Sequence, residues 1–355
     1  MTIERSVSRR IAILRALLIM SVAFLHIGTP DVSVLDQQNA FELLRFFIQD
    51  EMGRFAVPTL TLVSGYLLFS SGLYTTPLKL YKKKISTLLV PFLFFNVAYF
   101  AVQYAIEYGT GWAPLYVLTD KPDLRNFNYL FSYSAMPLNG ALHFLRDLLM
   151  LVLLAPLFGW FMRRMPLFGL VLVTAIFMSD MDGRLVNRST MAVLFYVGGL
   201  AAVKRWDVKR FDHLAIPALV LLVLVCIATM YYRIENLVYI YLAAPCAVWP
   251  ASSLLLNTSI GNLAEKYSKY SFFLFLTHTP LIRVAENLCV RYGRDLCAIE
   301  YTMLTFMFLI VFAPMLYMAA MRVMPETFRL LIGGRTAKVR PVDTREPVGI
   351  VLANG

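Results

Sequence analysis

The sequence predicts an all-α, polytopic membrane protein, and three features support this fold class. The chain has 355 residues, of which 59% are hydrophobic and only 15% are charged, and its mean hydropathy is +0.65. Several apolar runs approach or exceed the roughly 20 residues that a helix needs to cross a bilayer. Lys and Arg gather in every second loop, which is typical of loops on the cytoplasmic side of a membrane.

We expect about ten transmembrane helices; the fifth and sixth are short, and without this pair the number would be eight. The basic loops predict that both the N and the C terminus lie in the cytoplasm. The net charge of +11 therefore indicates attraction to anionic lipid and not to nucleic acid. A membrane domain over residues 1–321 precedes a basic cytoplasmic tail, residues 322–355, that we expect to be mobile. The predicted spans are 11–28, 55–70, 85–106, 141–162, 166–179, 189–203, 214–232, 237–256, 270–290 and 301–321.

The first span, RRIAILRALLIMSVAFLHIG, contains Arg15 and His26. Eleven positions separate them, which on a helix returns to within about 20° of the same face and about 16 Å along the axis. An ionisable side chain inside a membrane is costly and marks a functional site or needs a partner. Taken singly, Arg15 could reach the inner interface and His26 could merely end the span. The shared face favours a site in which His26 accepts a proton and Arg15 holds an anion.

Two features near the first span extend this hypothetical site. Asp31 follows His26 by five residues and could orient its ring. The second span begins with GRFAVPTLTLVSGYLLF, in which Arg54 lies at the outer end and Ser64 nearer the inner one. A short basic segment, here called the lysine step, follows on the cytoplasmic side of this span. It either marks only the topology of the chain or binds the phosphates of a nucleotide-bearing donor. It consists of Lys82, Lys83 and Lys84.

Further polar residues lie in the fourth and ninth spans. His143, Arg146 and Asp147 open the fourth span, and His278 lies near the middle of the ninth. Adjacent helical residues point about 100° apart, so Arg146 and Asp147 should need partners on other helices more than each other. Each residue alone could serve an interhelical hydrogen bond. Together the four predict a polar cavity within the bundle.

The outer segment 107–140 is rich in aromatic residues, Asp and Asn. Such a segment either forms an interfacial aromatic belt or offers a platform on which the apolar face of a sugar packs. Cys289 and Cys297 flank another outer loop and could form a disulfide if that side is oxidising.

These segments resemble, in the same order, the family-3 membrane acyltransferases of bacteria. The resemblance rests on the Arg-x10-His spacing of Arg15 and His26, and on RFAVPTLTLVSGYLLF, YKKKISTLLVPF, HFLRDLLMLVLLAPL and FLTHTPL, and it extends to about residue 321. It implies O-acylation of cell-envelope glycans at the bacterial inner membrane, with a cytoplasmic acyl-CoA as donor. It also implies that His26 is the catalytic histidine and Arg15 its partner.

On this resemblance we expect transfer of an acetyl or succinyl-type group from acyl-CoA to a hydroxyl of an exopolysaccharide, an O-antigen or a lipid-linked sugar. No permanently bound cofactor and no metal are expected, and polysaccharide assembly proteins are further candidate partners. The lysine step and Arg15 would bind the donor, and His26 would act as general base, with Arg54 or Arg146 at the oxyanion. An acyl-histidine intermediate is the alternative to direct transfer. The candidate substrate-binding residues are Arg54, Ser64, His143, Arg146, Asp147 and His278.

Two other classes of function remain open at this point. A transporter or flippase of lipid-linked saccharides would usually show inverted repeats, broken paired helices or intramembrane carboxylates. This sequence shows no repeat, and Asp147 is the only acidic residue clearly inside a span. A non-catalytic scaffold would have no use for Arg15 and His26 on one helix face.

Overall fold

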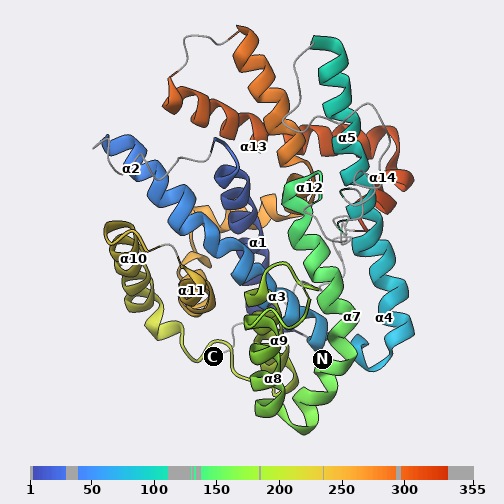
Figure 1. Ribbon diagram of the computed structural model, residues 1–355, viewed down its shortest axis with the longest axis vertical. Coiled ribbons are helices and arrows are strands. Elements are labelled where there is room, and N and C mark those ends of the chain that lie inside the picture. The colour runs from blue at the N-terminus through green and yellow to red at the C-terminus, as the bar shows by residue number, and fades with distance from the viewer. Residues whose placement is uncertain are drawn as a thin grey trace, which may run out of the picture.

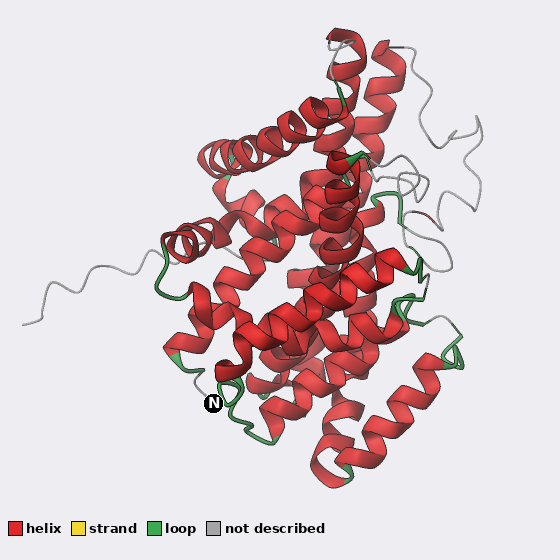
Figure 2. Cartoon of the chain, turned by 90° about the vertical axis from the view of Figure 1, so that its left-hand side faces the viewer, coloured by secondary structure: helices red, strands yellow, loops and turns green. Residues whose placement is uncertain are grey.

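The computed structural model is built of helices (Figure 1). It describes residues 3–28, 39–110, 129, 132, 137–183, 185–234, 236–292 and 297–334, and no β-strand occurs among them (Figure 2). The α-helices are α1 (Arg5–Leu25), α2 (Ala40–Phe46), α3 (Ala56–Ser70), α4 (Pro77–Lys84), α5 (Val90–Thr110), α7 (His143–Arg164), α8 (Pro166–Met178), α9 (Ser189–Val203), α10 (Ala215–Tyr231), α11 (Val238–Ala251), α12 (Ser259–Tyr292), α13 (Ala298–Val323) and α14 (Pro325–Leu331).

The predicted fold class is confirmed as an all-helical architecture with apolar, membrane-length helices. Each of the ten predicted ranges falls on a helix. The shorter apolar helices α8 and α9 match the two spans that were expected to be short. The number ten and the cytoplasmic location of the termini stay predictions. Within the described residues, six helical segments are long and apolar enough to cross a membrane: Ala40–Ser70, Pro77–Ala105, Gly140–Arg164, Asp212–Tyr231, Val238–Leu255 and Ala298–Val323.

Helical structure extends beyond the predicted spans in two places. Residues 40–55, expected as part of an outer loop, form α2, a π-helical turn η2 (Phe47–Met52) and a 3-10 turn η3 (Gly53–Phe55) that run directly into α3. Helix α12 begins at Ser259, eleven residues before the predicted span. Both extensions mix charged and polar residues with apolar ones, so hydropathy alone does not reveal them, and both bring further residues to the bundle interior.

Helix α14 holds the beginning of the C-terminal tail against the bundle. Its Phe328 is buried, and the ring lies 5.3 Å from the rings of both Phe273 and Tyr317. Helix α14 lies beside α5 (Figure 1). The tail is therefore packed on the helices as far as this segment, and residues 335–355 lie outside the described residues.

Helix α1 runs through the bundle and is fixed at its N-terminal end by Arg10, whose side chain is fully buried. The guanidinium donates to Asp212 Oδ2 at 2.8 Å and to Ser252 Oγ at 2.9 Å, and it lies 4.4 Å from the centre of the Trp249 ring. The ion pair, the hydrogen bonds and the aromatic ring offset the hydration that the buried guanidinium of Arg10 loses.

Helices α3 and α9 approach closely because glycine occupies the contact on both. A Cβ added at Gly65 would overlap the carbonyl oxygen of Phe195, and one added at Gly198 would overlap the carbonyl oxygen of Leu62. Small residues permit such backbone contact between membrane helices. This contact fixes α3, which carries residues of both cavities described below.

We expect Gly198→Ala to lower the free energy of unfolding by about 1–3 kcal/mol, because the added methyl group must push the two helices apart. The midpoint of thermal unfolding of the detergent-purified protein measures the effect. The matched control is Gly109→Ala, since nothing lies within 4 Å of a Cβ at that position of α5. Equal midpoints for the two variants would contradict close packing at Gly198.

Candidate functional site

His26 ends helix α1, and its ring is held in one tautomer. It is the C-terminal cap residue of that helix, and its Nδ1 lies 2.7 Å from the carbonyl oxygen of Val22. A carbonyl oxygen can only accept a hydrogen bond, so Nδ1 of the neutral ring carries the proton. The lone pair is then on Nε2, the nitrogen that can accept a proton from a substrate.

Gln49 of η2 fixes the end of α1 that carries His26. Its Nε2 donates to the carbonyl oxygens of Phe24 at 2.7 Å and of Ile27 at 3.0 Å. These carbonyls belong to the last turn and its continuation, where a helix leaves acceptors unsatisfied. Gln49 is fully buried. The sequence analysis missed it because its segment was expected to be a loop.

His278 of α12 supports the His26 ring from the side. The two imidazoles are 5.1 Å apart between centroids and meet edge to face at 65°. His278 Nδ1 lies 2.9 Å from the carbonyl oxygen of Phe275, and its side chain is 0% exposed. Its Nε2 has no hydrogen-bond partner among the residues that the structure describes. His278 is thus a buried neighbour of His26.

His26 opens on a cavity of about 200 Å³, here called the His26 cavity. His143, at the start of α7, also lines it. His143 Nδ1 lies 2.7 Å from the carbonyl oxygen of Gly140, so its Nε2 is again the acceptor, and that atom is buried without a partner in the described part of the chain. The cavity therefore offers two imidazole lone pairs for hydroxyl groups. Its charged or ring-bearing lining residues are His26, His143, Arg54, Arg188, Phe144 and Phe275.

Two arginines make the His26 cavity electropositive. Arg54 Nε donates to Asp50 Oδ1 at 3.0 Å, so this arginine is partly neutralised. The side chain of Arg188 is exposed, and within the described part of the chain it makes no hydrogen bond or ion pair. An arginine in this state can bind an anion or a developing oxyanion. Arg188 was not among the predicted site residues, although its position directly before the sixth predicted span was the available signal.

Arg146 and Asp147 brace the loop that presents Arg188. Arg146 Nη1 donates to Asp147 Oδ1 at 3.0 Å, but Arg146 also donates to the carbonyl oxygens of Ser132 and Leu185, so partners outside the pair outnumber the bond between them, as predicted. Asp147 in turn accepts hydrogen bonds from the backbone N–H groups of Asn187 and Arg188, each at 3.1 Å. Neither residue is among those that line the His26 cavity. They hold residues 187–188 in place through a buried charge pair.

Arg15 faces a second cavity, of about 330 Å³, here called the Arg15 cavity. It is partly buried, and among the residues that the structure describes it has no hydrogen-bond or ion-pair partner. Lys83 and Lys84 lie on the same cavity, as does Ser64, whose Oγ donates to the carbonyl oxygen of Leu60 at 2.7 Å. Three cationic side chains around one cavity suit a polyanionic ligand.

The structure thus divides the predicted site residues between two cavities on one side of α1. Arg15 and His26 are on neighbouring cavities and not on a single one. Asp31 and most of segment 107–140 lie outside the described residues. All four cysteines, Cys289 and Cys297 included, are free thiols. The predicted residues on the His26 cavity are His26, Arg54 and His143, those on the Arg15 cavity are Arg15, Ser64, Lys83 and Lys84, and those on neither lining are Lys82, Arg146, Asp147 and His278.

Comparisons with known proteins identify the family of the chain. The family model described as an acyltransferase domain, that of acyltransferase family 3, matches residues 9–322. The chain is 28% identical to the succinoglycan biosynthesis protein ExoH of Rhizobium meliloti (strain 1021), over 98% of this chain and 97% of that protein. No solved structure matches. Because the family match covers most of the chain, the protein belongs to acyltransferase family 3 and is an acyltransferase.

Proposed function

We propose that this protein is an inner-membrane O-acyltransferase that moves an acetyl or succinyl-type group from acyl-CoA to a hydroxyl of an envelope polysaccharide or lipid-linked sugar. The observation that carries the proposal is the acceptor nitrogen of His26 on a cavity that adjoins a second, basic cavity. The similarity to a succinoglycan biosynthesis protein supports a polysaccharide as the acceptor. In the predicted topology, the Arg15 cavity faces the cytoplasm and the His26 cavity faces outward.

The reaction follows from the tautomer of His26. Nε2 takes the proton of the acceptor hydroxyl while the oxygen attacks the carbonyl carbon of the thioester. The C–S bond then breaks, its electron pair leaves with the CoA sulfur, and an ester remains on the glycan. The proton passes from His26 to the leaving thiolate or to water. An acyl-histidine formed on Nε2 is the alternative first step, and the same nitrogen would serve it.

The other residues of the His26 cavity have distinct roles in this reaction. Arg188 and Arg54 would stabilise negative charge on the thioester oxygen. Arg188 also suits the terminal carboxylate of a succinyl-type group, since its side chain has no other partner among the described residues. His143 Nε2 would accept a hydrogen bond from a second hydroxyl of the sugar and so orient the acceptor.

The proposal is tested by mass spectrometry of envelope polysaccharide from cells that lack the protein. Deletion should remove an ester-linked mass increment, and the wild-type gene should restore it, which also identifies the acyl group. An unchanged acyl pattern, with polysaccharide missing from the outer surface, would instead indicate transport.

The lysine step provides a matched test of the donor site. We expect the double substitution Lys83→Gln and Lys84→Gln to raise the KM for acyl-CoA about threefold to tenfold, because each lysine contributes up to about 1 kcal/mol to binding of an anion. Lys82→Gln is the control, because Lys82 is next in sequence but does not line the Arg15 cavity. Initial rates in membrane vesicles give both values. If the double variant had an unchanged KM for acyl-CoA, we would conclude that CoA does not bind in this cavity.

A further inference from the structure

The Arg15 cavity and the His26 cavity share part of their walls. Of the residues that line them, Phe144 and Phe275 border both. Phe144 belongs to the first turn of α7 and directly follows His143, whereas Phe275 lies on α12, one turn before His278. The two aromatic residues therefore stand between the basic cavity and the imidazoles of the site.

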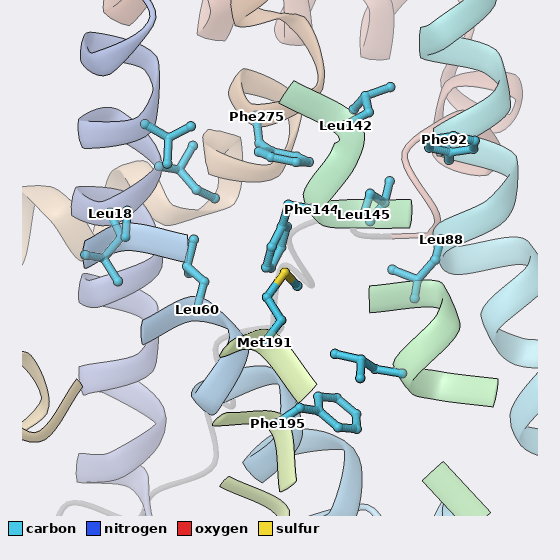
Figure 3. Close-up of a cluster of buried hydrophobic side chains, with 14 of the residues drawn as sticks. Leu18, Leu60, Leu88, Phe92, Leu142, Phe144, Leu145, Met191, Phe195 and Phe275 are labelled. Atoms are coloured by element: carbon cyan, nitrogen blue, oxygen red, sulfur yellow. The ribbon is translucent and has the colours of Figure 1, made fainter. Parts of the chain in front are cut away.

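The rings close on each other across the gap between α7 and α12. Their centroids are 5.8 Å apart and the ring planes meet at 81°, an edge-to-face contact. Figure 3 shows Phe275 directly above Phe144. Phe144 is 9% and Phe275 5% exposed. Little surface is left open between them, so the described structure holds the pair closed.

Phe275 is also connected to the catalytic histidine. Its ring centroid lies 6.2 Å from that of His278, which in turn meets His26 at 5.1 Å. On the other side its ring stacks on Phe272, which lines the Arg15 cavity but not the His26 cavity. A change in the Phe275 rotamer would therefore be felt on both sides of the pair.

We infer that Phe144 and Phe275 form a closed aromatic partition between the two cavities, and that the acyl thioester reaches His26 only when this pair parts. The inference rests on the proposed function for the identity of what passes, but the partition itself is a property of the fold. The two rings set the width of the passage, so they also select for small acyl groups. A closed partition further keeps water of the His26 cavity from the bound thioester.

Cysteine labelling in membranes tests the partition without any enzymatic activity. In a chain whose four native cysteines are replaced by alanine, Ser64→Cys reports on the Arg15 cavity and Val57→Cys reports on the His26 cavity. A charged, membrane-impermeant methanethiosulfonate is applied to one face at a time, using spheroplasts and inverted vesicles. In the parent chain each cysteine should react from one face only, and the two faces should be opposite.

Opening the partition should change only one of these reactions. With Phe144→Ala and Phe275→Ala together, Ser64→Cys should react from the face of the His26 cavity at least tenfold faster than in the parent. Leu67→Ala is the matched control, because Leu67 lines the Arg15 cavity and not the His26 cavity, and it should leave that rate unchanged. Labelling of Val57→Cys at the parent rate shows that the variant is folded. If the alanine variant is not folded, the double substitution Phe144→Leu and Phe275→Leu is used in its place. It keeps the apolar bulk and should give a smaller increase in the labelling rate of Ser64→Cys.

Two results would overturn the inference: reaction of Ser64→Cys from both faces in the parent, or no increase in either double variant. A second readout is release of free CoA from acyl-CoA without any glycan, which the alanine pair should increase. If the wild type transferred no acyl group at all, the proposed function would be wrong. The labelling experiment would still show whether the partition exists.

Discussion

We expect His26→Ala to abolish detectable acyl transfer without reducing the amount of folded protein in the membrane. The substitution removes the one acceptor nitrogen that α1 presents to the His26 cavity, and loss of a general base costs about a hundredfold to ten-thousandfold in rate. His26→Gln should be equally inactive, because an amide cannot take up the proton at neutral pH. Mass spectrometry of polysaccharide from complemented cells, at matched membrane levels, gives the result.

The controls for His26 are the two other imidazoles of the site. His278→Gln and His143→Gln both leave His26 in place, so each should retain activity, reduced by about tenfold, through a less well-oriented base or acceptor. For His143 the loss should lie mainly in the KM for the glycan. Full activity of His26→Gln would refute the mechanism, even though membership of the acyltransferase family would stand.

The fold was predictable where apolar length determined it. Every predicted span lies on a helix because about 20 apolar residues have few other structures in a membrane. The segments that escaped prediction are the polar ones, η2 and the first third of α12. Their burial depends on tertiary partners such as Phe24 for Gln49, and hydropathy does not contain such partners.

The site was predictable to a similar extent and for a related reason. Arg15 and His26 were visible because charge in an apolar run is costly. The division into two cavities was not, because it depends on Phe144 and Phe275, apolar residues whose contact forms only when their two helices are in place. Arg188 was not predicted because its proposed role depends on Asp147 of another helix, which holds the backbone of Arg188 in place.

The second large effect is expected for Arg15→Met, which should impair catalysis while it stabilises the fold. Loss of a charge-assisted contact with the donor costs about 1.5–3 kcal/mol, so kcat/KM for acyl-CoA should fall about tenfold to a hundredfold. The free protein should gain up to about 1 kcal/mol, because Arg15 is partly buried and has no partner among the described residues to offset its lost hydration. Initial rates and the midpoint of thermal unfolding measure the two effects, and Arg15→Lys should retain part of the activity.

Arg10→Met, on the same helix, is the control, and we expect it to change the free energy of unfolding in the opposite direction. Arg10 is buried with Asp212 and Ser252 as partners, so its loss should lower the free energy of unfolding by about 1–3 kcal/mol. Since Asp212 stays partly hydrated, with 28% of its side chain exposed, the cost should not reach that of a fully buried orphan charge. Two arginines five residues apart on one helix would then differ because one is held by the protein and the other is kept free for a ligand. A lowered unfolding midpoint in Arg15→Met would show that Arg15 stabilises the bundle, and the assignment of Arg15 to the donor would then lose its physical basis.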